Sequence, residues 1–211
     1  MSASDSEQAS NRPGLIYLHG FRSSPQSDKV TELRQWLDSH QVSVELHVPD
    51  LGFEPAEAIQ RVSDIVECFG DRPCGLMGSS LGGYYASVVA ARHRLRAVLI
   101  NPAVAPYQLL DGYIGTQTNL YTGEAFEVTR DHMLQLQEME LGASLNTADL
   151  MVLLQTADET LDYRDACRRY SSASQWIQPG GDHRFQNFPR VLPAAMAFLG
   201  IPLPDTLMPR D

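Results

Sequence analysis

The chain is poor in cysteine and in positive charge, and it has no long hydrophobic run. Its three cysteines, Cys68, Cys74 and Cys167, are odd in number and lack the spacing of metal ligands. This pattern predicts free thiols and no metal site. No apolar stretch approaches the roughly 20 residues that a bilayer-spanning helix needs, and the polar segment 1–12 lacks the apolar stretch of a secretory signal. These absences predict a protein of the reducing cytoplasm without a membrane insertion.

The balance of charge also restricts the partners of this protein. Sixteen lysines and arginines stand against 26 aspartates and glutamates, so the formal net charge is −10 and the pI is about 5.0. A surface of this sign repels the phosphates of nucleic acids and of anionic lipids. A length of 211 residues with 43% hydrophobic content is sufficient for one buried core. We therefore expect a single domain over 13–200, a disordered tail at 1–12 and a second tail at 201–211.

Short apolar runs alternate with helical patterns along most of the chain. Runs such as 14–18 are continuous and apolar, which is typical of buried parallel strands. The segment 55–69 carries apolar residues at three- and four-residue spacing, which is typical of an amphipathic helix. Strand and helix in alternation predict a three-layer α/β fold with a mostly parallel sheet. The expected strands are 14–18, 42–48, 75–77, 95–100, 150–154 and 175–177, and the expected helices are 26–40, 55–69, 81–92, 161–170 and 187–199.

One connection, 103–149, is much longer than the roughly six residues that usually join two elements. It contains polar turns, several aromatic residues and a helical pattern over 129–141. We interpret this segment as a short cap over the active site. The alternative is a decoration that packs against an edge of the fold elsewhere.

Residues 78–82 read Gly-Ser-Ser-Leu-Gly, between an apolar run and a helix of small residues. A G-x-S-x-G sequence at a strand-to-helix junction is typical of a nucleophile elbow. This turn forces its central residue into a strained conformation, so the residues two positions away must lack bulk. Ser80 has Gly78 and Gly82 at these places, whereas Ser79 has larger neighbours. Ser80 is therefore the candidate nucleophile.

A serine nucleophile needs a base, and the base needs an acid that orients it. In the elbow architecture the acid follows a later strand and the histidine follows the last strand. Asp158 follows strand 150–154, and His183 lies in a glycine-led loop after the last strand, so these two residues are the candidates. Helix capping is the alternative role for Asp158, while Asp162 and Glu159 are weaker candidates for the acid. Four other histidines are expected to face solvent: His40, His47, His93 and His132.

The oxyanion of a tetrahedral intermediate needs two N–H donors, each of which contributes roughly 3–4 kcal/mol to stabilising the transition state. One is expected from Leu81, which opens the helix after the elbow. The other is expected from the loop after the first strand, with Phe21 preferred and Arg22 second. His19 precedes this loop, and a structural role that holds the loop is expected for it.

Several segments together resemble the YqiA/YcfP-like small bacterial esterases of the α/β-hydrolase superfamily. The resemblance implies a compact hydrolase fold that lacks the first two strands of larger members, and esterase activity through Ser80, Asp158 and His183. Two positions depart from the expected pattern, with Leu120 in place of proline and Asp182 in place of asparagine. A carboxylate beside the base is expected to raise its pKa. The segments that carry the resemblance are 17–27, 78–84, 101–104, 117–124, 158–163 and 181–185.

The sequence therefore predicts a serine hydrolase that cleaves small-molecule carboxylic esters or thioesters through an acyl-enzyme, without a cofactor or metal. Two alternatives share the same residues. A carbon–carbon bond hydrolase uses the same triad, and a non-catalytic protein can retain the fold to bind a small molecule. The presence of Ser80, Asp158 and His183 together favours an enzyme, because a binding protein does not need all three.

Overall fold

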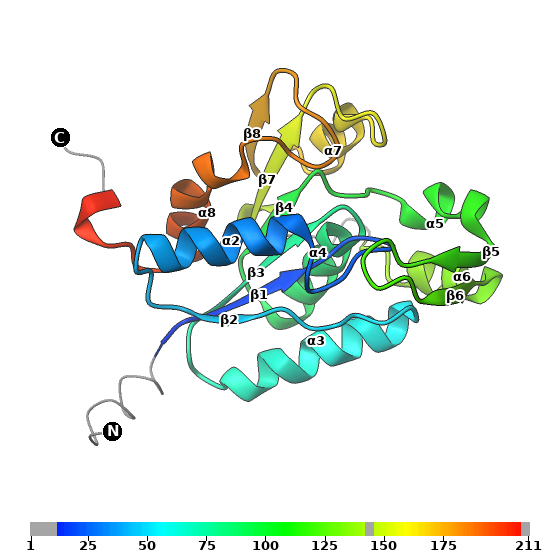
Figure 1. Cartoon of the computed structure of the whole chain (residues 1–211), viewed down its shortest axis with the longest axis horizontal. Helices are drawn as coiled ribbons and strands as arrows, with labels where there is room; N and C mark the ends of the chain where they lie inside the picture. Colours follow the sequence, from blue (N-terminus) through cyan, green and yellow to red (C-terminus); the bar gives the residue numbers. More distant parts are fainter. Residues whose placement is uncertain (1–11, 142–145, 208–211) are drawn as a thin grey trace.

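The computed structural model describes residues 12–141 and 146–207. Its centre is a six-stranded sheet in the order β2-β1-β3-β4-β7-β8 (Figure 1). Every neighbouring pair in this sheet is parallel, so the predicted parallel sheet is confirmed. The strands are β1 (Gly14–Leu18), β2 (Glu45–His47), β3 (Cys74–Ser79), β4 (Ala97–Ile100), β7 (Leu150–Gln155) and β8 (Ser174–Gln178).

Both faces of the sheet are buried because alternate side chains of the central strands point to opposite sides. Ile16 and Leu18 of β1 belong to one hydrophobic cluster, whereas Leu15 and Tyr17 belong to the other. The continuous apolar runs of the sequence therefore supply two cores. The helices that cover them are α2 (Asp28–Ser39) and α8 (Leu192–Leu199) on one face, and α3 (Pro55–Phe69), α4 (Leu81–His93) and α7 (Tyr163–Arg169) on the other.

The predicted cap folds into several short elements between β4 and β7. Figure 1 shows α5 (Pro106–Leu109), β5 (Gly115–Thr118), β6 (Ala125–Val128) and α6 (Arg130–Glu138) together at the right-hand end of the molecule, the end toward which β1 points. The hydroxyl of Tyr84 in α4 donates to the carbonyl oxygen of Leu136 at 2.6 Å, which joins the cap to the helix after the elbow. Strands β5 and β6 form an antiparallel pair, and the cap also contains the 3-10 turns η1 (Asp111–Tyr113) and η2 (Thr147–Asp149).

His132 in the cap corrects one expectation, because this histidine does not face solvent. Its residue surface is 5% exposed, and its Nε2 lies 2.8 Å from Oε1 of Glu54, which precedes α3. The spacing of His132 from the buried Leu136 and Met139 places it on the inward face of α6, but its partner is about 80 residues away in the sequence.

The predicted tail 1–12 is described only at residue 12, the predicted tail 201–211 is described over 201–207, and the cap segment 142–145 lies outside the described residues. After α8, the chain still contributes Ile201 to a core cluster, where this side chain is 3% exposed. The 3-10 turns η3 (Phe188–Arg190) and η4 (Asp205–Leu207) flank α8 in the sequence.

Candidate active site

The turn between β3 and α4 holds Ser80 in the conformation that a nucleophile elbow requires. Ser80 has φ 55° and ψ −121°, a region that residues with a side chain rarely occupy. The carbonyl oxygen of Ser80 accepts from Gly83 at 3.0 Å and from Ala103 at 3.1 Å, and its N–H donates to Ile100 at 3.0 Å. These hydrogen bonds keep the Ser80 backbone in its strained conformation, so the hydroxyl stays at the carboxyl edge of the sheet.

The glycines around Ser80 are required by close backbone approach. A Cβ on Gly78 would lie 2.2 Å from the carbonyl oxygen of Gly82, and a Cβ on Gly82 would lie 2.1 Å from the carbonyl oxygen of Leu18. Gly20, in the loop after β1, approaches Ser80 itself, since a Cβ there would lie 3.3 Å from the Ser80 Cβ. The motif therefore reflects the packing of the elbow against β1 and the loop that follows it.

The three residues predicted for catalysis are close together in the structure. Nε2 of His183 lies 3.1 Å from Oγ of Ser80. Nδ1 of the same ring lies 2.9 Å from Oδ2 of Asp158. The Asp158 side chain is 2% exposed and that of His183 is 23% exposed, so the acid is shielded while the imidazole faces the cleft. This chain of contacts allows a proton to pass from the serine to the imidazole.

Asp158 also bonds to its own turn, because Oδ1 accepts the N–H of Leu161 at 2.8 Å and that of Thr160 at 2.9 Å. It does not cap the following helix. The cap of α7 is Asp162, whose carboxylate accepts the N–H of Arg164 and pairs with its guanidinium. This pairing holds the pKa of Asp162 low, at about 2.

The His183 loop is held by Asn101 and Gln155, for which the sequence predicted no role in the site, and by Glu159, which was considered only as an alternative acid. Asn101, after β4, donates from Nδ2 to the carbonyl oxygens of Asp182 at 3.0 Å and His183 at 3.3 Å. Gln155, at the end of β7, accepts the N–H of Asp182 at 3.1 Å. Glu159 accepts the N–H of His183 at 3.0 Å. Asn101 and Gln155 are 3% and 2% exposed, so these anchors are parts of the core.

The two expected oxyanion donors lie beside the elbow. No acceptor for the N–H of Phe21 or of Leu81 is found among the residues that the structure describes. Leu81 opens α4, where the helix dipole favours negative charge. The loop that carries Phe21 is held by the cap, since Asn119 donates to the carbonyl oxygen of Ser23 at 2.8 Å and Leu120 donates to that of Arg22 at 2.9 Å.

His19 holds the start of this loop, as expected. Its Nδ1 lies 3.1 Å from the carbonyl oxygen of Gly20, and its Nε2 lies 3.5 Å from the N–H of Leu51. Burial lowers the pKa of His19, which favours the neutral ring that this pair of contacts requires.

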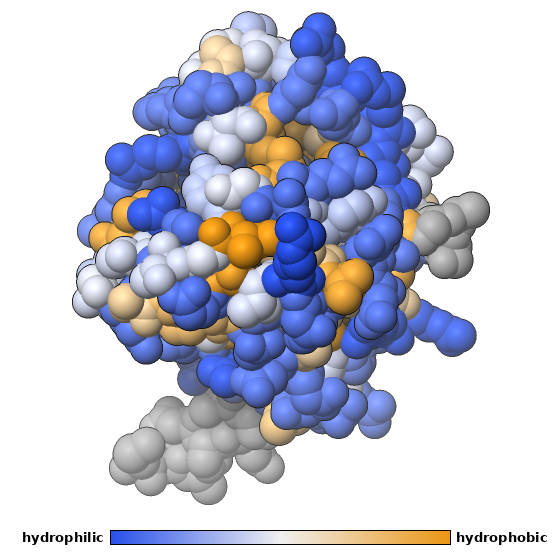
Figure 2. Space-filling model, turned by 90° about the vertical axis from the view of Figure 1, so that its right-hand side faces the viewer, coloured by the Kyte–Doolittle hydropathy of each residue, from blue (hydrophilic) through white to orange (hydrophobic). Residues whose placement is uncertain are grey.

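Two clefts of different polarity meet at Ser80. One has a volume of about 450 Å³ and is lined by charged residues that include Lys29, Glu32 and Arg184. Burial lowers the pKa of Lys29 to about 8. The other cleft has a volume of about 300 Å³ and is lined mainly by apolar residues of the cap and the elbow. Figure 2 faces this end of the molecule and shows hydrophobic residues gathered near its centre among hydrophilic ones.

The departures from the expected family pattern have local consequences. Asp182 does not bond the imidazole. Its Oδ2 accepts from Gln186, and its Oδ1 is buried without a partner within the described part of the chain. Leu120 is 69% exposed and lines both clefts.

Over residues 12–141 and 146–207, no cluster of three or more His, Cys, Asp or Glu side chains has the arrangement of a metal site. In the same ranges, no helix has both the length and the apolar character for a membrane crossing.

Solved structures similar to this chain are α/β hydrolases in name or in fold. A protein of Agrobacterium vitis S4 matches with a TM-score of 0.71 and 19% identity, over 90% of this chain and 89% of its own. Est1E from Butyrivibrio proteoclasticus matches with a TM-score of 0.70 and 14% identity, over 90% and 87%. The mouse alpha/beta hydrolase domain-containing protein 10 matches with a TM-score of 0.66 and 17% identity, over 85% and 86%. These likenesses confirm the predicted α/β-hydrolase fold.

Sequence relatives extend over most of the chain. A UPF0227 protein of Shewanella sp. strain MR-7 is 26% identical over 191 residues, which cover 87% of this chain and 98% of the relative. The UPF0227 protein YcfP of Salmonella paratyphi A is 25% identical over 187 residues, which cover 87% and 97%. The model of the uncharacterised protein family UPF0227 matches residues 14–200. The chain therefore belongs to the UPF0227 family, which confirms the resemblance to YcfP-like proteins seen in its motifs.

Proposed function

We propose that this protein is a serine hydrolase that cleaves carboxylic esters or thioesters through an acyl-enzyme intermediate. The observation that carries the proposal is the contact of Ser80 Oγ with His183 Nε2 at 3.1 Å, on a ring whose Nδ1 lies 2.9 Å from Asp158. The backbone strain at Ser80 supports it, since such strain is concentrated at functional sites. The esterase domain of a Rhodothermus marinus protein has a similar fold, with a TM-score of 0.65.

The proposed reaction follows from this geometry. Ser80 attacks the carbonyl carbon of the substrate while His183 accepts its proton, and Asp158 stabilises the resulting imidazolium. The N–H groups of Phe21 and Leu81 donate to the oxyanion. His183 then gives the proton to the leaving alcohol or thiol, and the acyl group remains on Ser80. Water repeats these steps and releases the acid.

The proposed location is the cytoplasm, where thiols stay reduced. Cys68, Cys74 and Cys167 are all free in the structure. Burial raises the pKa of the Cys74 thiol to about 12, which makes this sulfur a poor nucleophile at neutral pH. None of the three cysteines lines either cleft at Ser80.

Two neighbouring serines provide a direct test. Ser80→Ala should lower kcat on p-nitrophenyl butanoate by at least about 10³-fold, because no other group forms the acyl-enzyme. Ser79→Ala is the matched control, since Ser79 is the adjacent residue and its hydroxyl bonds to Tyr17 rather than to the imidazole. A fluorophosphonate probe should label the wild type and Ser79→Ala but not Ser80→Ala. Undiminished turnover by folded Ser80→Ala would refute the proposal.

A further inference from the structure

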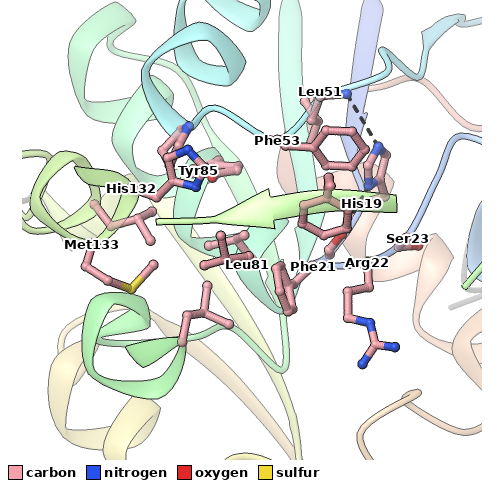
Figure 3. A pocket seen from close by; sticks show the side chains of 17 residues that line it. His19, Phe21, Arg22, Ser23, Leu51, Phe53, Leu81, Tyr85, His132 and Met133 are labelled. Carbon is pink, nitrogen blue, oxygen red and sulfur yellow. Dashed lines mark hydrogen bonds between the residues drawn. The ribbon is translucent and has the colours of Figure 1, made fainter. Parts of the chain in front are cut away.

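A small apolar cavity lies under the cap beside the apolar cleft. Its volume is about 40 Å³, whereas the cleft at Ser80 measures about 300 Å³. Figure 3 shows His132 and Met133 on one side of this cavity and Phe21 and Arg22 on the other. Ser80 and His183 line the cleft but not the cavity. The two spaces are therefore separate, and only the cleft reaches the proposed reacting atoms.

A partition made of shared side chains separates the cavity from the cleft. Phe21, Arg22, Leu81 and Leu110 line both spaces. The ring of Phe21 packs edge-on against Tyr113 at 5.5 Å and against Phe126 at 5.9 Å between ring centroids.

The two partners of Phe21 show where the partition runs. Tyr113 lines the cleft, and Phe126 lines the cavity. The ring of Phe21 thus lies between the two spaces, and Leu110 of the cap and Leu81 of the elbow complete the boundary.

The cavity suits a hydrocarbon group because its lining is mostly apolar and its two histidines already have partners. His19 contacts the backbone of Gly20 and Leu51. His132 contacts Glu54 through Nε2 and the N–H of Thr129 through Nδ1. A cavity lined mainly by apolar groups favours apolar occupants.

We propose that the acyl chain of the substrate occupies the apolar cleft, and that the partition of Phe21, Leu81 and Leu110 sets its maximum length. This inference rests on the proposed esterase function. Ser80 and His183 line both clefts, and the leaving group is assigned to the charged cleft because Lys29, Glu32 and Arg184 there suit a polar group. The substrate class is then an ester or thioester that joins an apolar acyl group to a polar alcohol or thiol.

Removal of part of the partition should extend the acyl site into the cavity. At about 10–15 Å³ for each water-sized group, a space of about 40 Å³ accepts a few more methylenes. Each newly buried methylene raises kcat/KM about fourfold.

Leu110 is the residue to change because it is half-buried and its side chain has no proposed part in the chemistry. Leu110→Ala should raise the ratio of kcat/KM for p-nitrophenyl octanoate over butanoate by about tenfold or more. The matched control is Leu134→Ala, the same substitution in the cap at a position that is 56% exposed and lines neither space. This control should leave the ratio unchanged.

A second variant fills the cavity from its far side. Val128 lines the cavity but not the cleft, so Val128→Leu in the Leu110→Ala background should lower the octanoate ratio again by about fourfold. Folding of each variant is checked by its thermal transition.

Two results would overturn the partition: a wild type that prefers octanoate, or a folded Leu110→Ala variant with the wild-type ratio. If turnover does not depend on Ser80 in any variant, the esterase proposal itself fails, and the Ser80→Ala measurement separates that outcome from the others.

Discussion

Replacement of Asn101 is predicted to weaken both the fold and the proposed chemistry. The Asn101 side chain is 3% exposed, and it joins the end of β4 to the His183 loop. Its Nδ2 donates to two carbonyl oxygens of this loop, at 3.0 and 3.3 Å, and its Oδ1 accepts the N–H of Gln155 at 3.0 Å. Asn101 also has φ 39°, a left-handed conformation that asparagine tolerates better than alanine.

The magnitude follows from these contacts. In Asn101→Ala, the buried N–H of Gln155 loses its acceptor, at a cost of about 1–3 kcal/mol. The left-handed backbone adds about 1 kcal/mol. We therefore expect the free energy of unfolding to fall by about 2–4 kcal/mol. The His183 loop loses at the same time the two hydrogen bonds that the Asn101 amide donates to it. We expect the imidazole to shift as a result, and a displacement of about 1 Å lowers kcat by about 10²-fold.

The assay must separate a displacement of the His183 imidazole from a loss of stability of the whole protein. Unfolding in urea gives the stability change, and kcat on p-nitrophenyl butanoate gives the activity of the folded protein. Val62→Ala is the control, because Val62 is 0% exposed in α3 and lines neither cleft. It should lose stability by a comparable amount and keep its kcat. A wild-type kcat in folded Asn101→Ala, or an equal loss of kcat in Val62→Ala, would refute the positioning role.

Two further predictions concern the packing of the elbow and the charge of a buried imidazole. Gly82→Ala places a Cβ 2.1 Å from the backbone oxygen of Leu18, so we expect urea unfolding to show a loss of stability of more than about 3 kcal/mol. The control is Gly112→Ala, which has no atom within 4 Å of its Cβ and should change stability by less than about 0.5 kcal/mol. Equal effects of the two substitutions would contradict the steric argument. Burial lowers the pKa of His19, so below about pH 6.5 the unfolded chain binds a proton that the folded chain does not. The free energy of unfolding should then fall more steeply from pH 7 to pH 5 in the wild type than in His19→Gln. Parallel curves for the two proteins would argue against a buried neutral ring.

Local sequence patterns were sufficient for most of the fold. The helix predicted over 55–69 has these bounds in the structure, and the strand predicted over 14–18 does as well. Burial on both faces makes such strands continuously apolar, and burial on one face gives such helices their stripe. The elbow was also readable, because the steric demands of its turn are met by glycines within the motif.

Contacts between distant segments could not be read in this way. The contact of His132 with Glu54 joins residues that are about 80 positions apart, so the place of His132 on the buried face of α6 did not reveal its partner. Asn101 and Gln155 stood in the sequence only as residues at the ends of strands. Their roles depend on the approach of the His183 loop to the sheet, which no local pattern encodes.

The sequence by itself determined the order of the elements, the strained serine turn and the identity of the proposed acid and base. The first two follow from side-chain periodicity and from backbone sterics within a few residues, and the acid and base follow from their places after later strands in the chain order of the elbow architecture. Only the tertiary structure decided how the cap meets the site: Asn119 holds the loop of Phe21, and Leu110 closes the cleft beside it. These contacts join segments that are about 90 residues apart, so they exist only after the sheet has brought those segments together.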